Sequence, residues 1–415
     1  MMRHGERIAC PDCGLLQDLP PARAGHRAQC GRCARVLAGL ATGRVEVPLA
    51  LALTALLFFI PAVVLPLLGV ASFGAHRYSW LYSGVTAFDA QGFWPLGLLL
   101  AAFALIFPLI YLGGLVWVLA NLKHHHLEPL GRIPLGRIFR WVGTFRPWMM
   151  LEVYLVGGFV AYSRINAVAS IEVEAGGWCL LVATFSLMIA LTQLDERTVW
   201  AALPVPVTSI TPPADGFVAC TVCDWIAPHD AQGSACARCQ ATLHPRKPES
   251  VQRTIALVTA GYLLYIPANL LPVLTIVRFG HEERSTILSG VFELIRNDLW
   301  PLAAIVFAAS IVLPLMKLFG LTWMLIAINS RARNLLVSRT RLYRVIDAIG
   351  RWSNIDVFMA ALLIALLQFG TLTQVYSGPG LLAFAGVVVV TMFATLVFDT
   401  RLMWDAAGRN TRVSA

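Results

Sequence analysis

Long apolar stretches alternate with short polar segments along this 415-residue chain. Eight of the stretches contain almost no charged residues, and each has about the length that a helix needs to cross a hydrocarbon core of about 30 Å. The pattern predicts an all-α polytopic membrane protein with eight transmembrane helices. The predicted spans are Val47–Ala71, Phe93–Asn121, Pro147–Ala169, Gly177–Leu194, Thr254–Val277, Leu299–Ile328, Ile355–Tyr376 and Pro379–Phe398.

The second half of the chain repeats the first. Residues 59–66 (FIPAVVLP) align with residues 265–272 (YIPANLLP) at an offset of 206, and the offset later becomes 204 and pairs Glu152 with Asp356. So many collinear matches indicate a tandem duplication. Because each copy holds four spans, both copies enter and leave the membrane on one side, which makes them parallel repeats. Further pairs are Ser83/Ser289, Trp94/Trp300, Pro108/Pro314, Trp117/Trp323, Asp195/Asp399 and Trp200/Trp404.

A cysteine-rich polar segment precedes each copy, so each unit is a small ribbon followed by four helices. No secretory signal is expected, because the first apolar stretch follows this polar segment and not a short basic one. The segment between the copies is rich in Pro and Thr, which indicates a semi-rigid linker. The expected domains are ribbon 1 (1–46), transmembrane repeat 1 (47–200), the linker (201–216), ribbon 2 (217–250), transmembrane repeat 2 (251–405) and a C-terminal tail (406–415).

Composition and charge support the membrane prediction and orient the chain. Hydrophobic residues make up 58% of the sequence and charged residues 13%, where a soluble domain has about a quarter charged. The net charge of +9 is concentrated between the spans: 26 of the 32 Lys and Arg residues fall in the segments that share a side with the N-terminus. The positive-inside rule therefore predicts cytoplasmic termini and cytoplasmic ribbons. We interpret this basic charge as facing anionic lipid and expect no nucleic-acid partner.

Eight of the nine cysteines form two matching sets of CxxC pairs. Two residues between cysteines allow one tight turn to direct both sulfurs at a single ion, and two such turns complete a tetrahedral four-sulfur site. Zn²⁺ is the usual ion for this geometry, and Fe bound as in rubredoxin is the alternative. The predicted metal ligands are Cys10, Cys13, Cys30 and Cys33 in ribbon 1, and Cys220, Cys223, Cys236 and Cys239 in ribbon 2.

Disulfides are the competing interpretation of these cysteines, but a reducing cytoplasm disfavours them. A thioredoxin-type site is disfavoured as well, because no βαβ pattern surrounds any CxxC pair. A site whose four positions are all taken by sulfur is closed, so we expect a structural role, with metal binding supplying the stability of each small ribbon.

The two repeats differ at polar positions inside the predicted spans. Asn269, Ser310 and Lys317 stand where repeat 1 has Val63, Ala104 and Tyr111. Proline kinks or breaks a helix, and Pro267 and Pro272 (like Pro61 and Pro66) are expected to do so in the first span of their repeat, as Pro108 and Pro314 are in the second span. A purely architectural kink is the alternative interpretation of these prolines.

Lys317 must face water or a partner, because a charge deep in a membrane is costly. Asp356 is the candidate partner, placed near the cytoplasmic start of the seventh span. Since Lys317 lies at a depth of about 16 Å, a direct pair requires staggered helices, and a bridging water is the alternative. The hypothesis is that repeat 2 holds a polar transport or gating site formed by Lys317, Asp356, Asn269, Ser310, Pro267 and Pro272.

These motifs resemble the paraquat-inducible protein A family over nearly the whole chain. The shared features are the paired CxxC ribbons and, in the second copy, IPANLLP, Pro314-x-x-Lys317 and Trp352-x-x-x-Asp356. Asp224 and Gln240 depart from the usual glycine that follows a CxxC pair, which leaves the shape of ribbon 2 open.

The resemblance implies a multi-pass protein of the bacterial inner membrane that works with a periplasm-spanning protein carrying mammalian-cell-entry (MCE) domains. Such systems move phospholipid between the inner and outer membranes. The chain has no GxxxxGK[ST] loop, so energy must come from a partner or an ion gradient. The competing hypotheses are a metal or redox sensor that signals through the ribbons and a non-transporting anchor for a periplasmic partner. An enzyme is not expected, because no nucleophile–base pair or open metal site is evident.

Overall fold

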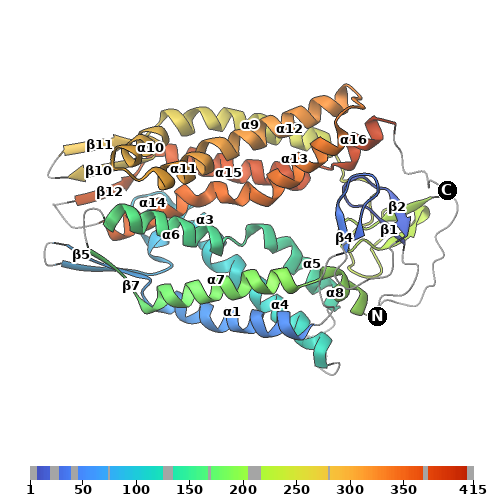
Figure 1. Cartoon of the computed structure of the whole chain (residues 1–415), viewed down its shortest axis with the longest axis horizontal. Coiled ribbons are helices and arrows are strands. Elements are labelled where there is room, and N and C mark those ends of the chain that lie inside the picture. Colours follow the sequence, from blue (N-terminus) through green and yellow to red (C-terminus); the bar gives the residue numbers. More distant parts are fainter. Residues whose placement is uncertain are drawn as a thin grey trace.

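The computed structural model describes residues 7–18, 28–38, 45–72, 75–124, 134–166, 170–203, 216–278, 281–367 and 373–408. Two helical bundles lie side by side along the long axis of the molecule (Figure 1). Short strands project from one end, which we call the sheet end, and the two cysteine ribbons lie at the other, the ribbon end (Figure 1).

The elements of repeat 1 recur in the same order in repeat 2, as a duplication requires. Repeat 1 consists of α1 (Glu46–Val64), β5 (Leu68–Ser72), β6 (Ala75–Ser79), α2 (Ser83–Ala90), α3 (Trp94–Ala101), α4 (Phe107–His124), α5 (Leu135–Phe145), α6 (Leu151–Asn166), β7 (Ser170–Val173), α7 (Ala175–Gln193) and α8 (Glu196–Ala202). Repeat 2 consists of α9 (Ser250–Leu270), β10 (Leu274–Arg278), β11 (His281–Ser285), α10 (Ile287–Arg296), α11 (Trp300–Phe307), α12 (Leu313–Asn329), α13 (Leu336–Ile349), α14 (Ile355–Leu366), β12 (Thr373–Ser377), α15 (Pro379–Val397) and α16 (Arg401–Ala406).

Six helical segments of the described chain are long and apolar enough to cross a membrane. Two of the eight predicted spans fall outside this set: α6 has 16 residues, and α9, with 21 residues, is less apolar. Both nevertheless pack as members of the bundles, α9 along α15 in the way that α1 packs along α7, and α6 along α14. The six segments are Glu46–Val64, Trp94–Lys123, Ala175–Gln193, Trp300–Asn329, Leu336–Leu366 and Pro379–Val397.

Two three-stranded antiparallel sheets, with orders β6-β5-β7 and β11-β10-β12, correct the expectation of an all-α membrane domain. The predicted spans Val47–Ala71 and Thr254–Val277 each end in a strand, β5 and β10. The reason is a proline: α1 ends at Val64 and α9 at Leu270, and Pro66 and Pro272 then lack the N–H that would continue the helix. These two prolines therefore end the helices, whereas Pro61 and Pro267 lie inside continuous ones.

The second span of each repeat is locally distorted, as the prolines in it predict. A π-helical turn at Ala102–Ile106 joins α3 to α4, and one at Ala308–Val312 joins α11 to α12. Pro108 and Pro314 each follow one of these turns, where the missing proline N–H disturbs the regular ladder of hydrogen bonds.

The seventh predicted span, Ile355–Tyr376, corresponds to α14 and β12. A candidate membrane segment runs from Leu336 to Leu366 as α13, a 3₁₀ turn at Gly350–Asn354 and α14, and residues 373–377 form β12. The prediction of Ile355–Tyr376 was therefore right at its start, where α14 begins at Ile355, and wrong at its end, where the chain forms a strand. Asp356 lies in the first turn of α14, near the start of that helix, as predicted.

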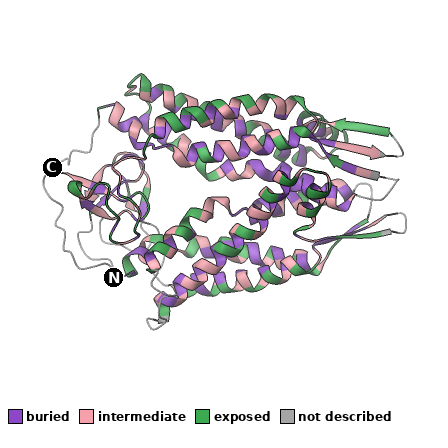
Figure 2. Cartoon of the chain, turned by 180° about the vertical axis from the view of Figure 1, so that it is seen from behind, coloured by how far each residue is buried: buried purple, intermediate pink, exposed green. Residues whose placement is uncertain are grey.

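The two repeats meet along α6 and α14, which are equivalent helices. Every residue of α14 except Ala365 is buried, whereas the outer faces of the surrounding helices are exposed (Figure 2). Gly157 of α6 allows this close packing, because a Cβ there would lie 3.0 Å from Cβ of Phe358. The helix at the centre of the molecule is therefore α14, which belongs to repeat 2.

Ribbon 1 packs on repeat 2, although it precedes repeat 1 in the sequence. Its strands are β1 (Arg7–Ala9), β2 (Leu16–Asp18), β3 (Ala28–Gln29) and β4 (Val36–Ala38). Its cysteines and Ile8 share an apolar cluster with Trp404 of α16, and the Thr400 hydroxyl donates to the Asp12 carbonyl at 2.9 Å. Figure 1 shows this ribbon beside α16.

Ribbon 2, with strands β8 (Phe217–Ala219) and β9 (Ile226–Pro228), packs on repeat 1. Gly136 of α5 approaches its backbone so closely that a Cβ there would lie 2.1 Å from the Arg238 carbonyl oxygen. Arg197 of α8 forms an ion pair with Asp224 at 3.6 Å. Each ribbon is thus docked on the opposite repeat.

Candidate functional site

The eight predicted ligands form two buried four-cysteine groups. Within each group the sulfur atoms all lie within 4.8 Å of one another. The pairs Cys10–Cys33 and Cys220–Cys239 are 3.5 Å apart, and Cys13–Cys30 and Cys223–Cys236 are 3.6 Å apart. A tetrahedron with metal–sulfur bonds of about 2.3 Å has sulfur–sulfur edges of about 3.8 Å, so each group fits one metal ion.

Four similar tight turns present these sulfurs. After the second cysteine of each CxxC pair comes a residue with left-handed backbone: Gly14, Ala34, Asp224 or Gln240, with φ between 56° and 72°. In every case its N–H bonds back to the first cysteine's carbonyl, for example Gln240 to Cys236 at 2.9 Å. Asp224 and Gln240 therefore adopt the glycine-like conformation, and ribbon 2 keeps the shape of ribbon 1.

All nine cysteines are free thiols, and the sulfur–sulfur distances are far longer than a disulfide bond of about 2.05 Å. Cys179, outside the two groups, lies half-buried in α7. Both four-cysteine groups could hold a metal ion, and because all four positions are sulfur they leave none open for a substrate.

A second group of polar residues lies buried at the centre of repeat 2. It contains six side chains that are at most 4% exposed. Three come from the π-helical turn before α12 and the 3₁₀ turn before α14, and three come from regular turns of α12, α14 and α15. Irregular turns free backbone groups and make room for polar side chains that a regular apolar helix would exclude. We call these residues the polar cluster: Ser310, Lys317, Ser353, Asn354, Asp356 and Thr391.

Lys317 is held by its surroundings without an ion pair. Its Nζ lies 3.4 Å from the Thr391 hydroxyl oxygen, and its Cε packs so tightly on Gly350 that a Cβ there would be 2.8 Å away. Among the described residues, Lys317 and Asp356 form no salt bridge. Lys317 of α12 instead packs on Gly350 in the 3₁₀ turn that precedes Asp356 and α14, and an interaction through a bridging water stays a prediction.

Asp356 is the counterpart of Glu152, and the two carboxylates have different partners. Glu152 receives a hydrogen bond from Arg351 of repeat 2 at 2.7 Å. Asp356 lies close to the Ser310 hydroxyl, and the positive charge acting on it comes from Arg164 of α6. Its Oδ1 has no hydrogen-bond partner among the described residues, nor have Ser353 Oγ and Asn354 Oδ1. The polar cluster thus holds several unused acceptors in an apolar interior.

The equivalent region of repeat 1 is less polar, apart from Glu152. Leu187 stands at the position of Thr391 and Met150 at that of Asn354, alongside Tyr111 and Ala104, and all four are buried. Met150 and Asn354 also contact each other between the repeats, with Asn354 Nδ2 2.9 Å from the Met150 sulfur. The two repeats therefore have a more polar and a less polar version of the same interior.

The remaining predicted residues lie elsewhere. Asn269 is in the last turn of α9 at the sheet end, where its amide donates to the Tyr265 carbonyl at 2.9 Å. Pro267 and Pro272 are at the same end of α9. Functional roles for these three stay predictions. Sequence reasoning missed Thr391 and Gly350, although comparison of Thr391 with Leu187 at the offset of 204 would have identified the first.

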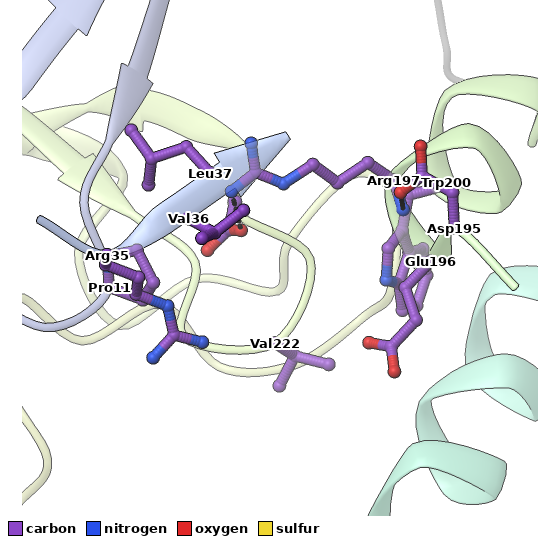
Figure 3. A pocket seen from close by; sticks show the side chains of 10 residues that line it. Pro11, Arg35, Val36, Leu37, Asp195, Glu196, Arg197, Trp200 and Val222 are labelled. Carbon is purple, nitrogen blue, oxygen red and sulfur yellow. Dashed lines mark hydrogen bonds and ion pairs between the residues drawn. The ribbon is translucent and has the colours of Figure 1, made fainter. Parts of the chain in front are cut away.

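A pocket of about 190 Å³ lies at the ribbon end, where both ribbons meet α8. Figure 3 shows Arg197 extending from α8 toward Val36 and Leu37 of ribbon 1. Burial raises the pKa of Asp224, which faces this pocket, and the charge of Arg197 opposes that effect. The residues that line this pocket therefore come from ribbon 1, ribbon 2 and the region of α8.

Comparison with known proteins adds a family to this geometry. The sequence model of the family described as paraquat-inducible protein A matches residues 45–204 and 251–408, which are the two repeats. The chain is 30% identical over 409 residues to the intermembrane transport protein PqiA of Escherichia coli (strain K12), covering 96% of each protein. No solved structure matches the chain.

Two further relatives have related names. The lipophilic envelope-spanning tunnel protein A of Escherichia coli (strain K12) is 28% identical over 404 residues, which cover 97% of this chain and 92% of that protein. A probable intermembrane transport protein of Haemophilus influenzae is 24% identical over 409 residues, with 97% and 96% covered. These similarities extend over both ribbons and both repeats.

Proposed function

Because this chain belongs to the paraquat-inducible protein A family, we propose that it moves phospholipid between membranes. In this proposal the chain is an inner-membrane transporter, or the loading component of one. It exchanges phospholipid with a periplasm-spanning partner that carries MCE domains, toward or from the outer membrane. The names of the relatives support intermembrane transport. The six helical segments that are long and apolar enough to cross a membrane support a membrane location.

The proposed topology has eight spans, with α6 and α9 crossing the membrane together with the six more apolar segments. Both termini and both ribbons then face the cytoplasm, which places the two three-stranded sheets in the periplasm. The excess of Lys and Arg at the ribbon end supports this orientation. The sheet end is then the surface that meets the MCE-domain partner.

The polar cluster of repeat 2 is the proposed transport or gating site. One observation carries this proposal: Lys317 and Asp356 are buried within candidate membrane segments of repeat 2, while repeat 1 has Tyr111 and an arginine-paired Glu152. Ionisable groups are expensive in a membrane interior and are typical of ion or substrate pathways. Since the chain has no nucleotide-binding loop, Lys317 and Asp356 are the groups through which an ion gradient would act.

Lipid transfer between vesicles tests this function. Donor vesicles hold the protein and a fluorescent phospholipid, acceptor vesicles are unlabelled, and the soluble periplasmic part of the MCE-domain partner connects them. Lys317→Met should abolish transfer while its expression and thermal stability stay near those of the wild type. Tyr111→Met changes the equivalent position of repeat 1 and should retain most of the transfer.

The outcomes separate this function from its alternatives. Transfer by Lys317→Met at the wild-type rate would exclude the polar cluster as the transport site. Binding of the partner without any transfer by the wild type would indicate a non-transporting anchor. A metal or redox sensor would keep its function when residues of the polar cluster are changed. It would lose its signalling response when one ribbon cysteine is changed.

A further inference from the structure

One arginine of repeat 2 binds both the backbone and a sulfur of the ribbon 1 metal site. Arg344 projects from α13, and its Nη2 donates to the Cys33 carbonyl oxygen at 2.9 Å and lies 3.2 Å from Cys33 Sγ. Its Nε donates to Asp12 Oδ2 at 2.6 Å. A planar guanidinium therefore joins a metal ligand to a helix that enters the membrane domain.

Asp12 completes this contact from inside the CxxC turn. It lies between Cys10 and Cys13, is 3% exposed, and also accepts from Arg35 Nη1 at 2.5 Å. A carboxylate shared by two guanidinium groups in a buried position forms strong charge-assisted hydrogen bonds. The position of α13 is thus tied to the turn that presents two of the four sulfurs.

The equivalent contact is missing from the other half of the molecule. Arg140 of α5 stands at the position of Arg344, but its guanidinium lies over the Trp141 ring. Val222 replaces Asp12, and ribbon 2 rests on Gly136 through its backbone. Within the described part of the chain, Arg344 is the one side chain, apart from the cysteines themselves, that hydrogen-bonds a sulfur of either group.

A divalent ion held by four thiolates leaves a net charge of −2 at the site, which an adjacent guanidinium stabilises. Hydrogen bonds to metal ligands orient those ligands and strengthen metal binding, and their loss typically costs about 10–100-fold in metal affinity. The restraint is mutual. A sulfur bound to a metal has a fixed position, and it therefore also restrains the side chain that donates a hydrogen bond to it.

We propose that Arg344 is a positioning residue through which the metal in ribbon 1 holds α13 in place. α13 leads through the 3₁₀ turn at Gly350–Asn354 to Asp356, so the metal site braces the segment that carries the polar cluster. This inference concerns the metal and the helix, and it holds whether or not the polar cluster transports lipid.

Metal release from the full-length protein is the first test. The protein in lipid nanodiscs is loaded with zinc, excess chelator is added, and an indicator dye follows the release of both equivalents. Arg344→Gln should release one of the two equivalents about 10–100-fold faster than the wild type. Arg140→Gln, the matched change in repeat 1, should leave both rates unchanged. Wild-type rates for both equivalents in Arg344→Gln would overturn the proposal.

Hydrogen–deuterium exchange of α13 is the second test, and it needs no variant. Removing the zinc from the wild type should speed exchange in the α13 peptides at least 10-fold more than in the α5 peptides. Arg344→Lys keeps the positive charge but loses the planar set of guanidinium N–H donors. In this variant α13 should exchange faster than in the wild type with zinc bound, and removing the zinc should change its exchange rate less. Exchange in α13 that does not respond to zinc in the wild type would overturn the coupling, even if Arg344→Gln releases metal faster.

Discussion

Tyr154 and Phe358 occupy equivalent positions in the two repeats, and their rings meet edge to face with centroids 5.4 Å apart. Each side chain is almost completely buried. Equivalent residues of the two repeats therefore contact each other where α6 packs on α14. Both rings belong to one apolar core that includes buried residues of the two repeats.

Phe358→Ala should lower the free energy of unfolding by about 3 kcal/mol, because the buried ring leaves a cavity between the repeats. Phe159→Ala, on the outer face of α6, should cost far less, since that side chain is 60% exposed. Denaturant titration in mixed micelles measures both. Equal losses for the two variants would show that the contact between α6 and α14 is not a packing centre.

Gly350→Ala should impair transport by displacing Lys317. The added Cβ would lie 2.8 Å from Lys317 Cε and 3.4 Å from its Nζ, and overpacking of this kind costs about 1–3 kcal/mol. Gly143→Ala in α5 meets nothing within 4 Å and is the matched control. The vesicle assay should show reduced transfer for the first variant and wild-type transfer for the second.

Acid should destabilise the ribbon end through Asp399. Burial alone would raise the pKa of Asp399, but hydrogen bonds from the Arg401 side chain and the Lys247 backbone outweigh burial and lower it. A depressed pKa stabilises the fold above the unfolded value of about 3.9, and this stabilisation is lost as the pH falls through the folded pKa.

At neutral pH, Asp399→Asn should therefore have a free energy of unfolding about 1.5–3 kcal/mol lower than that of the wild type. On acidification below about pH 4, the variant should lose less stability than the wild type. Asp195→Asn, the equivalent change in repeat 1, removes bonds from the Arg197 N–H and the Thr198 hydroxyl only. Thermal unfolding at several pH values distinguishes the variants, and parallel curves for wild type and Asp399→Asn would contradict the prediction.

The purified protein should contain two equivalents of zinc per chain. Changing Cys30 or Cys236 to Ser should reduce the content to one equivalent, because the two four-cysteine groups are separate. Elemental analysis by mass spectrometry measures zinc and iron together. An iron content of two equivalents in protein from zinc-sufficient cells would replace the zinc assignment with the rubredoxin-like alternative.

The repeat, the cysteine groups and most helices could be predicted because each leaves a regular pattern in the sequence. Offsets of 206 and 204 located equivalent residues, and CxxC spacing identified the sulfurs that converge. Lys317 and Ser310 were found because they differ from their counterparts in repeat 1.

The sheets and the docking of the ribbons could not be predicted in this way. Strands β5 and β10 continue apolar stretches without a break, so their five residues resemble the end of a helix. The contact of Arg344 with Asp12 joins positions 332 residues apart, and nothing local to either residue indicates the other. Lys317 and Asp356 form no direct ion pair among the described residues, and the stagger of α12 and α14 could not be read from the sequence.

The crossed docking of the ribbons makes each half of the chain dependent on the other. A duplicated gene begins as two interchangeable copies, yet here Asp12 in one half matches Arg344 in the other, while Val222 and Arg140 offer no such match. Two copies of the first half, or two of the second, would lack one side of this contact. The two halves are therefore no longer interchangeable, and a change at Asp12 or at Arg344 alters a contact that the other half needs.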